Sequence, residues 1–282
     1  GLGGDVMDKK SNKFKAALFI FISLYLIVII FPFIWVFLTS FKPTQEIFGE
    51  GAFRLISESP TMENYANVLK NGILQSMWNS FVVAGITSIY VVMVATLAAY
   101  AITRFKFRGK NLLLGIILAV SMFPQMIIVG PIYNLFMNLN LTNSYFVVLP
   151  YSTITLPVAV FILVTHFNKI PIALEEAATI DGATSMQILS KIVFRLAAPG
   201  IFTTAIIVFI AAWNEFLLTV TLNTNKAYHT VPVAISFLRT QFTILWGDVT
   251  AATVIVTIPT LIIVLLFQKQ IVSGLTSGAV KE

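Results

Sequence analysis

The sequence KIPIALEEAATIDGA occupies residues 169–183, between two long apolar runs. Pro171 suits the first turn of a helix, where its missing backbone N–H costs nothing. Gly182 permits the positive φ that commonly ends a helix, and Thr184 or Ser185 can then cap a second helix. The stretch therefore predicts a short helix, a tight turn and another helix within a polar loop.

The composition around this loop is that of a membrane protein. Hydrophobic residues make up 57% of the 282 residues and charged residues only 11%, with a mean hydropathy of +0.90. A soluble domain carries about 25% charged residues. So few charges cannot cover a water-soluble surface of this size, and we expect an all-α integral membrane protein.

Six apolar runs are long enough to cross a bilayer, which takes about 20 residues in a helix. The predicted spans cover residues 14–38, 77–102, 112–136, 144–166, 200–222 and 249–267. A turn and a short surface helix are expected in the first outer loop. Prolines within the spans predict either ordinary kinks or broken helices that line a cavity; they are Pro32, Pro124, Pro131, Pro150, Pro157 and Pro259.

The lysines and arginines are distributed unequally between the loops on the two sides of the membrane. Thirteen fall on the side of the two termini, and five fall on the other side: Lys42, Arg54, Lys70, Lys226 and Arg239. The positive-inside rule then puts both termini in the cytoplasm. The loop at residues 167–198, with its second helix at 186–196, is expected there too. Residues 1–6 are expected to be a vector-derived remnant before a natural start at Met7.

The sequence lacks the motifs that are typical of several other functional classes. The chain has no cysteine, and its two histidines, His166 and His229, lie far apart, so we expect no metal site. A net charge of +6 in a membrane protein indicates biased loops, not nucleic-acid binding. The sequence has no G-x-x-x-x-G-K-[ST] phosphate loop. A membrane-embedded enzyme and a stand-alone secondary transporter or channel remain as alternatives, but neither has its expected cluster of intramembrane residues.

The polar loop resembles the EAA loop of bacterial ABC importer permeases, which reads E-A-A, three residues, G, nine residues, I-x-L-P. Here Glu176-Ala177-Ala178 precedes Gly182 by three residues, and Ile192 follows nine residues later. The match departs at Phe194-Arg195, where the family has Leu-Pro and its helix break. Without this resemblance, the loop could equally be an interfacial amphipathic segment. The resemblance implies that the loop docks an ATPase through Glu175, Glu176, Ala177, Ala178, Asp181 and Gly182.

Further stretches extend the resemblance over the chain from about Asn12 and indicate the maltose-type carbohydrate branch of the family. Each is weak alone, and their order and spacing carry the match. They lie at residues 35–43, 78–80, 98–101, 104–109, 122–125, 212–216 and 270–280.

The resemblance implies a type I ABC importer permease fold and a transport subunit that is not itself an enzyme. Its expected partners are a second homologous permease, two ATP-binding cassette subunits, an extracytoplasmic sugar-binding protein and membrane lipid. ATP and Mg²⁺ would bind to the partner ATPases, and no cofactor to this chain. The expected location is the bacterial plasma (inner) membrane, and the expected cargo is a disaccharide or oligosaccharide. A monosaccharide, a polyol and a glycerol phosphate remain open.

A few polar residues inside the predicted spans are candidates for the substrate path. Glu215 is foremost, because an ionisable group within a span indicates a functional site. The set is Asn214, Glu215, Trp213, Gln125 and Asn79. Packing is the alternative for each: interhelical hydrogen bonds for the polar side chains, and an interfacial position for Trp213. Asp248 is expected to cap the sixth span, and His166 to lie at a membrane interface.

Overall fold

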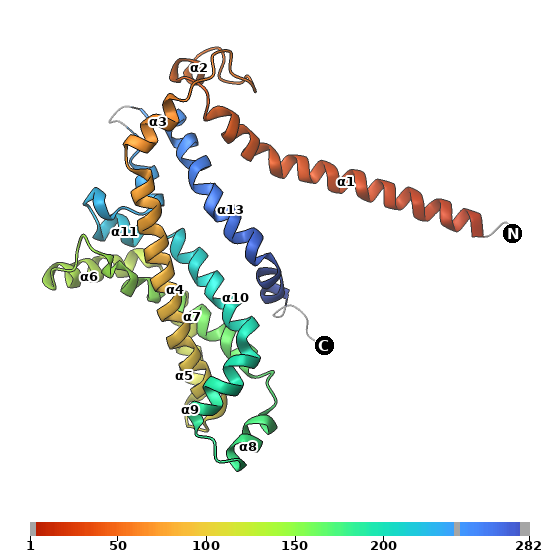
Figure 1. Ribbon diagram of the computed structural model, residues 1–282, viewed down its shortest axis with the longest axis vertical. Coiled ribbons are helices and arrows are strands. Elements are labelled where there is room, and N and C mark those ends of the chain that lie inside the picture. Colours follow the sequence, from red (N-terminus) through yellow and green to blue (C-terminus); the bar gives the residue numbers. More distant parts are fainter. Residues whose placement is uncertain (1–3, 240–242, 277–282) are drawn as a thin grey trace. The chain divides into compact units, whose positions relative to one another are not determined.

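The regular secondary structure is helical in the part of the chain that the computed structural model describes, residues 4–239 and 243–276 (Figure 1). Within those residues, the extended pairing is limited to an isolated bridge between Arg239 and Ile244. The expectation of an all-α protein is confirmed. Part of the expected remnant at residues 1–6 and the end of the chain after residue 276 lie outside the described residues.

The helices follow one another with short connections. The first half of the chain contains α1 (Gly4–Thr39), α2 (Thr44–Phe48), α3 (Glu63–Lys70), α4 (Ile73–Arg104), α5 (Lys110–Ser121), α6 (Gln125–Asn138) and η1 (Tyr145–Val147). The second half contains α7 (Val148–Phe167), α8 (Ile172–Ile180), α9 (Ser185–Ile188), the π-helical turn η2 (Leu189–Val193), α10 (Phe194–Trp213), α11 (Leu217–Leu222), η3 (Lys226–Tyr228), α12 (Val231–Ser236) and α13 (Trp246–Thr276).

Five helical stretches among the described residues are long and apolar enough to cross a membrane, and a bent pair raises the number to as many as six. The bend of this pair lies within the predicted span at residues 112–136. There α5 and α6 meet at an angle of 90°. Pro124 precedes α6 in an extended conformation; it lacks a backbone N–H and disfavours helix at the residue before it.

The fifth predicted span, residues 200–222, overlaps a longer helical stretch and a separate short helix. Its helix begins as early as Ser185 and ends at Trp213, and α11 is a separate segment. The second helix of the polar loop therefore does not stop at residue 196. It runs through Arg195 into the membrane span. The turn η2 lies within this continuous stretch.

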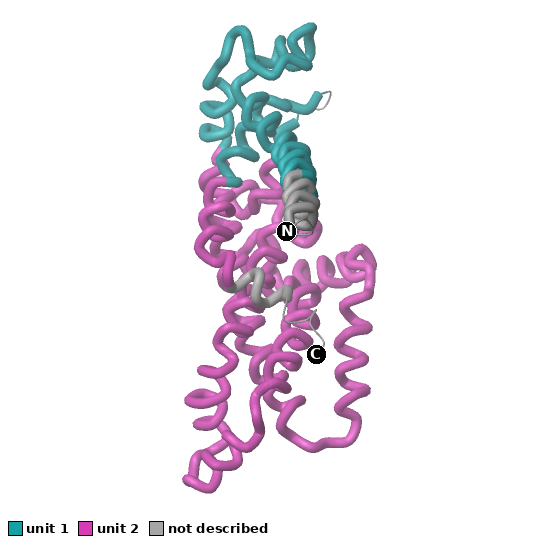
Figure 2. The backbone as a smooth tube through the Cα atoms, turned by 90° about the vertical axis from the view of Figure 1, so that its right-hand side faces the viewer, with its two compact units in different colours: residues 1–71, 238–257 teal, residues 72–237, 258–282 magenta. Residues whose placement is uncertain are grey.

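The chain divides into two compact units (Figure 2). Unit 1 comprises residues 1–71 and 238–257, and unit 2 comprises residues 72–237 and 258–282. In unit 2, α4, α7 and α10 pack against one another around small buried residues such as Ala95, Ala99 and Ala159. Small side chains let membrane helices approach closely. A Cβ on Gly200 would meet the ring of His166 at 2.5 Å, so glycine is required at that helix contact.

In unit 1, a buried lysine organises the loop after α1. Only 1% of Lys42 is exposed, and its Nζ donates to the carbonyls of Ala52 at 3.0 Å and Arg54 at 2.5 Å. The same ammonium lies 5.1 Å from the centre of the Trp35 ring. These contacts satisfy a charge that would be costly to bury alone. The expected short helix of this loop is α3.

Candidate coupling site and substrate path

The polar loop at residues 167–198, called the coupling loop below, contains the helix, turn and helix that its sequence predicts. Pro171 precedes α8 in an extended conformation, and Gly182 has a φ of +83° just after that helix. Thr184 caps α9: the backbone N–H of Gln187 donates to its Oγ1 at 3.4 Å, and its own N–H donates to Gln187 Oε1 at 2.8 Å. This reciprocal pair is a capping box.

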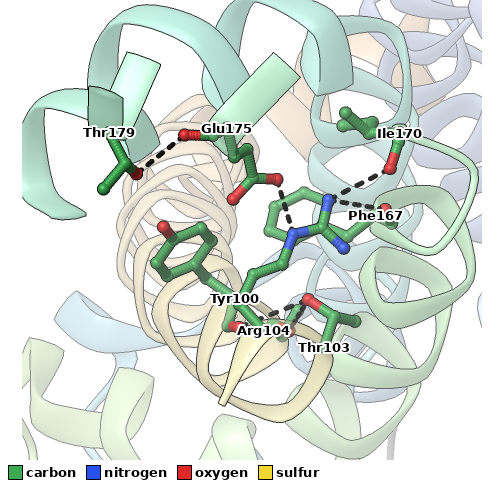
Figure 3. Close-up of polar contacts among 8 residues, drawn as sticks. Tyr100, Thr103, Arg104, Phe167, Ile170, Glu175 and Thr179 are labelled. Atoms are coloured by element: carbon green, nitrogen blue, oxygen red, sulfur yellow. Dashed lines mark hydrogen bonds and ion pairs between the residues drawn. The ribbon is translucent and has the colours of Figure 1, made fainter. Parts of the chain in front are cut away.

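An arginine at the end of α4 fixes the base of this loop (Figure 3). Arg104 Nε lies 2.5 Å from Glu175 Oε1 on α8. Its terminal Nη2 donates to the carbonyls of Phe167 at 3.1 Å and Ile170 at 3.3 Å, where α7 ends. Both charged side chains are buried, with 8% of Arg104 and 9% of Glu175 exposed. A cation at the carboxyl end of a helix satisfies carbonyls that lack intrahelical partners.

The six predicted coupling residues thus separate into two groups. Glu175 faces inward to Arg104, and Ala178 is half-buried and packs against the core of unit 2. Glu176, Ala177, Asp181 and Gly182 are exposed. Two neighbouring glutamates on one helix therefore face different environments, and only Glu176 has its carboxylate free to meet another protein.

The exposed surface of the coupling loop is also unusually apolar. Ile180, the last residue of α8, has 86% of its surface exposed. The other large apolar side chains exposed in this loop near α8 and α9 include Ile172, Leu174 and Met186. Apolar side chains flanked by the acids Glu176 and Asp181 have the character of a protein-binding surface.

Glu215, the foremost candidate for the substrate path, lies in the break between α10 and α11 and not within a continuous span. The backbone N–H groups of Leu218 and Thr219 donate to its two carboxylate oxygens at 2.7 and 3.2 Å. Thr219 also forms a hydrogen bond with the hydroxyl of Tyr151 on α7. The carboxylate is buried and thus caps the amino end of α11, where free N–H groups favour an anion.

Asn79 is fully buried, and all four hydrogen-bonding positions of its amide are used within the chain. Its Nδ2 donates to the carbonyls of Ala227 at 2.8 Å and His229 at 3.0 Å. Its Oδ1 accepts from Gln75 at 3.0 Å and from Tyr145 at 2.7 Å. Asn79 therefore ties α4 to the loop before α12 and has no polar group left over for a ligand.

The other three candidates for the substrate path differ in how far their side chains are exposed. Trp213 is buried and stacks on Phe209. Gln125 begins α6 directly after the bend and is half-buried. Asn214 is exposed, and its Nδ2 donates to the Ile210 carbonyl at 2.8 Å. Two of the five, Gln125 and Asn214, therefore lie at helix breaks with part of their side chains accessible.

The ionisable groups do not form a metal site. Among the described residues, no group of three or more histidine, cysteine, aspartate or glutamate side chains is placed to hold an ion. His229 stacks on Phe237, and burial lowers the pKa of its side chain. Its imidazole is therefore neutral at neutral pH.

Sequence reasoning used Arg104 as a positive charge that orients the chain and as part of the resemblance at residues 104–109, and it assigned no role to Tyr151 or Thr219. The sequence does contain features that indicate an ion pair for Arg104. It is the first basic residue after a long apolar run, and the coupling loop offers three acids to pair with it, Glu175, Glu176 and Asp181. Which acid it meets depends on how α4 and α7 pack, and one sequence does not show that.

The fold is that of an ABC importer permease. A crystal structure of a bacterial ABC transporter for the polysaccharide alginate contains a chain that superposes with a TM-score of 0.72 at 21% identity. The match covers 92% of this chain and 97% of the other. At that identity the likeness establishes the fold.

The chain belongs to the family described as the binding-protein-dependent transport system inner membrane component, whose profile matches residues 91–277. Relatives include the trehalose/maltose transport system permease protein MalG of Thermococcus litoralis, 41% identical over 90% of this chain and 92% of the relative. The trehalose transport system permease protein SugB of Mycobacterium tuberculosis is 41% identical over 89% and 92%. The resemblance inferred from the sequence is confirmed: this chain is a multi-pass permease subunit, not an enzyme.

Proposed function

We propose that this chain is one permease subunit of an ATP-driven importer that takes a disaccharide or oligosaccharide from an extracytoplasmic binding protein. The observation that carries the proposal is a helical coupling loop on a chain with two relatives, each matching about nine-tenths of its length, that are named for trehalose/maltose and for trehalose transport. The family description itself specifies dependence on a binding protein.

Coupling to ATP is proposed to run through the exposed side of α8. Glu176 and Asp181 provide negative charge there, and Ile180 provides an apolar anchor that inserts into a groove of an ATP-binding cassette subunit. Buried apolar anchors surrounded by polar contacts are the usual basis of a stable interface. ATP and Mg²⁺ would be bound by that subunit, since this chain has no phosphate loop.

The second permease and lipid are proposed to cover α1. The apolar stretch of this helix, residues 17–39, is not buried by the other described residues of unit 1. A helix that is apolar on all sides needs lipid or another membrane helix around it. Both termini are placed in the cytoplasm on the distribution of lysine and arginine.

The substrate path is proposed to pass the two breaks in the membrane helices. Breaks at mid-membrane expose backbone groups to a cavity, and transporters bind polar cargo at such places. Gln125 follows the bend between α5 and α6, and Asn214 lies between α10 and α11. Their amides are suited to sugar hydroxyls. Glu215 and Trp213 would stabilise this region without contacting the sugar, because both are buried.

Uptake into proteoliposomes tests this function. The chain is reconstituted with its second permease, ATPase and binding protein, and radiolabelled trehalose and maltose are offered outside. We expect accumulation that requires ATP inside and the binding protein outside. The matched control carries an ATPase whose phosphate-loop lysine is replaced. Accumulation that persists in this control, or without ATP, would identify a secondary transporter or channel instead.

A further inference from the structure

Arg104 joins three helices that are not all neighbours in sequence. It belongs to α4, it donates to carbonyls at the end of α7, and it pairs with Glu175 on α8 (Figure 3). The first helix of the coupling loop is already linked covalently to α7 before it and to α9 and α10 after it. The ion pair adds a connection to α4, which the chain itself does not provide.

We propose that Arg104 is a positioning residue that makes α4 move with the coupling helix α8, so that the force applied by an ATPase reaches α4 as well as α10. This inference rests on the proposed function, because it requires an ATPase that moves α8. The substrate is then handled by at least two helices driven from one docking point.

Burial makes this connection stiff. Both side chains are less than one-tenth exposed, and the guanidinium has three acceptors around it. Separating a buried ion pair leaves charges without partners in a poorly solvated place, which is strongly unfavourable. When α8 is displaced, α4 and the end of α7 therefore follow more readily than the pair opens.

The geometry requires arginine and not merely a positive charge. Nε meets the carboxylate while Nη2 reaches two carbonyls, so one planar fork holds all three partners. A lysine has a single ammonium on a flexible stem and cannot reproduce this arrangement. The next arginine, Arg108, is exposed and supplies a control with the same side chain.

The experiment uses the complete transporter in proteoliposomes and measures sugar imported per ATP hydrolysed. We expect Arg104→Gln and Arg104→Lys to lower this ratio by about fivefold or more, the size of a typical allosteric coupling. ATPase copurification and the binding of sugar-loaded binding protein should stay at wild-type levels. Arg108→Gln should leave the ratio unchanged.

A second variant separates positioning from simple loss of fold. Glu175→Gln keeps the size of the side chain and the bonds from Arg104 to the two carbonyls, and it should also lower the ratio. The double variant Arg104→Gln/Glu175→Gln should be no worse than Arg104→Gln alone, because both remove one connection.

Three results have different meanings. A wild-type ratio in both single variants would overturn the role of Arg104 and leave the proposed function intact. Failure of the wild-type transporter to hydrolyse ATP in response to the loaded binding protein would instead overturn the proposed function. A merely structural role would lower uptake, hydrolysis and melting temperature in parallel at a constant ratio, which also contradicts the proposal.

Discussion

Gly182→Val is expected to abolish transport-coupled ATP hydrolysis while the protein still inserts in the membrane. Gly182 has a φ of +83°, and an added Cβ would meet nothing within 4 Å. The penalty is therefore one of backbone conformation and not of crowding. A left-handed conformation costs an ordinary residue about 1–2 kcal/mol, and a β-branched residue more. The turn between α8 and α9 would change its angle, and the docked helix would lose its fixed relation to α10.

Gly182→Asn supplies the matched control at the same position. Asparagine tolerates positive φ better than other side chains, and in this chain Asn140 and Asn143 already adopt φ values of 55° and 53°. We expect this variant to keep most of the coupled hydrolysis. The measurement is ATPase activity stimulated by the sugar-loaded binding protein. Equal activity in the valine and asparagine variants would show that the turn conformation is irrelevant to coupling.

Glu215→Ala is expected to produce the other large effect, a loss of folded protein. The change leaves the N–H groups of Leu218 and Thr219 without their carboxylate acceptor in a buried position. Each buried group left unsatisfied costs about 1–3 kcal/mol. The amino end of α11 should loosen, because Thr219, whose hydroxyl bonds to Tyr151 on α7, loses its contacts with the carboxylate. Thermal unfolding in detergent and proteolysis of the loop after α11 measure this outcome.

Glu215→Gln distinguishes capping from a direct part in transport. Its amide oxygen still accepts one of the two N–H bonds, so we expect a smaller loss of stability and nearly normal uptake. Asn214→Ala is the companion variant, because this exposed neighbour is the residue proposed to meet the sugar. Its uptake should fall with no change in melting temperature. If Glu215→Ala kept normal stability and lost uptake, Glu215 would have a direct part in the substrate path.

Much of the fold follows from the length and position of apolar runs. The span at residues 77–102 is found within a longer helix, Ile73–Arg104, and the span at 144–166 as a helical stretch of equal length shifted by one residue, Tyr145–Phe167. Both are helical because a membrane helix must satisfy its own backbone. The breaks were harder to predict. Each of the two runs at residues 112–136 and 200–222 is apolar enough to be predicted as a single span. Hydropathy does not predict the 90° bend before α6 or the separation of α11 from α10.

The coupling loop could be predicted in more detail than the rest of the site because its signals are local. Pro171, Gly182 and Thr184 act on their own backbone, and the structure places them as their chemistry requires. Arg104 and Asn79 act on partners more than 60 residues away. Which partner each one meets depends on how the helices pack, and that information is spread over the whole chain.

Cross-linking from Ala177 tests the central claim, that the coupling loop is the joint between this chain and an ATPase. The chain has no cysteine, so Ala177→Cys places a single thiol on the exposed side of α8. A thiol-reactive photo-cross-linker attached there in native membranes should yield a product with the ATP-binding cassette subunit. Thr224→Cys, on the exposed loop before η3, should yield none. An importer that is active yet gives no ATPase product from position 177 would contradict the account.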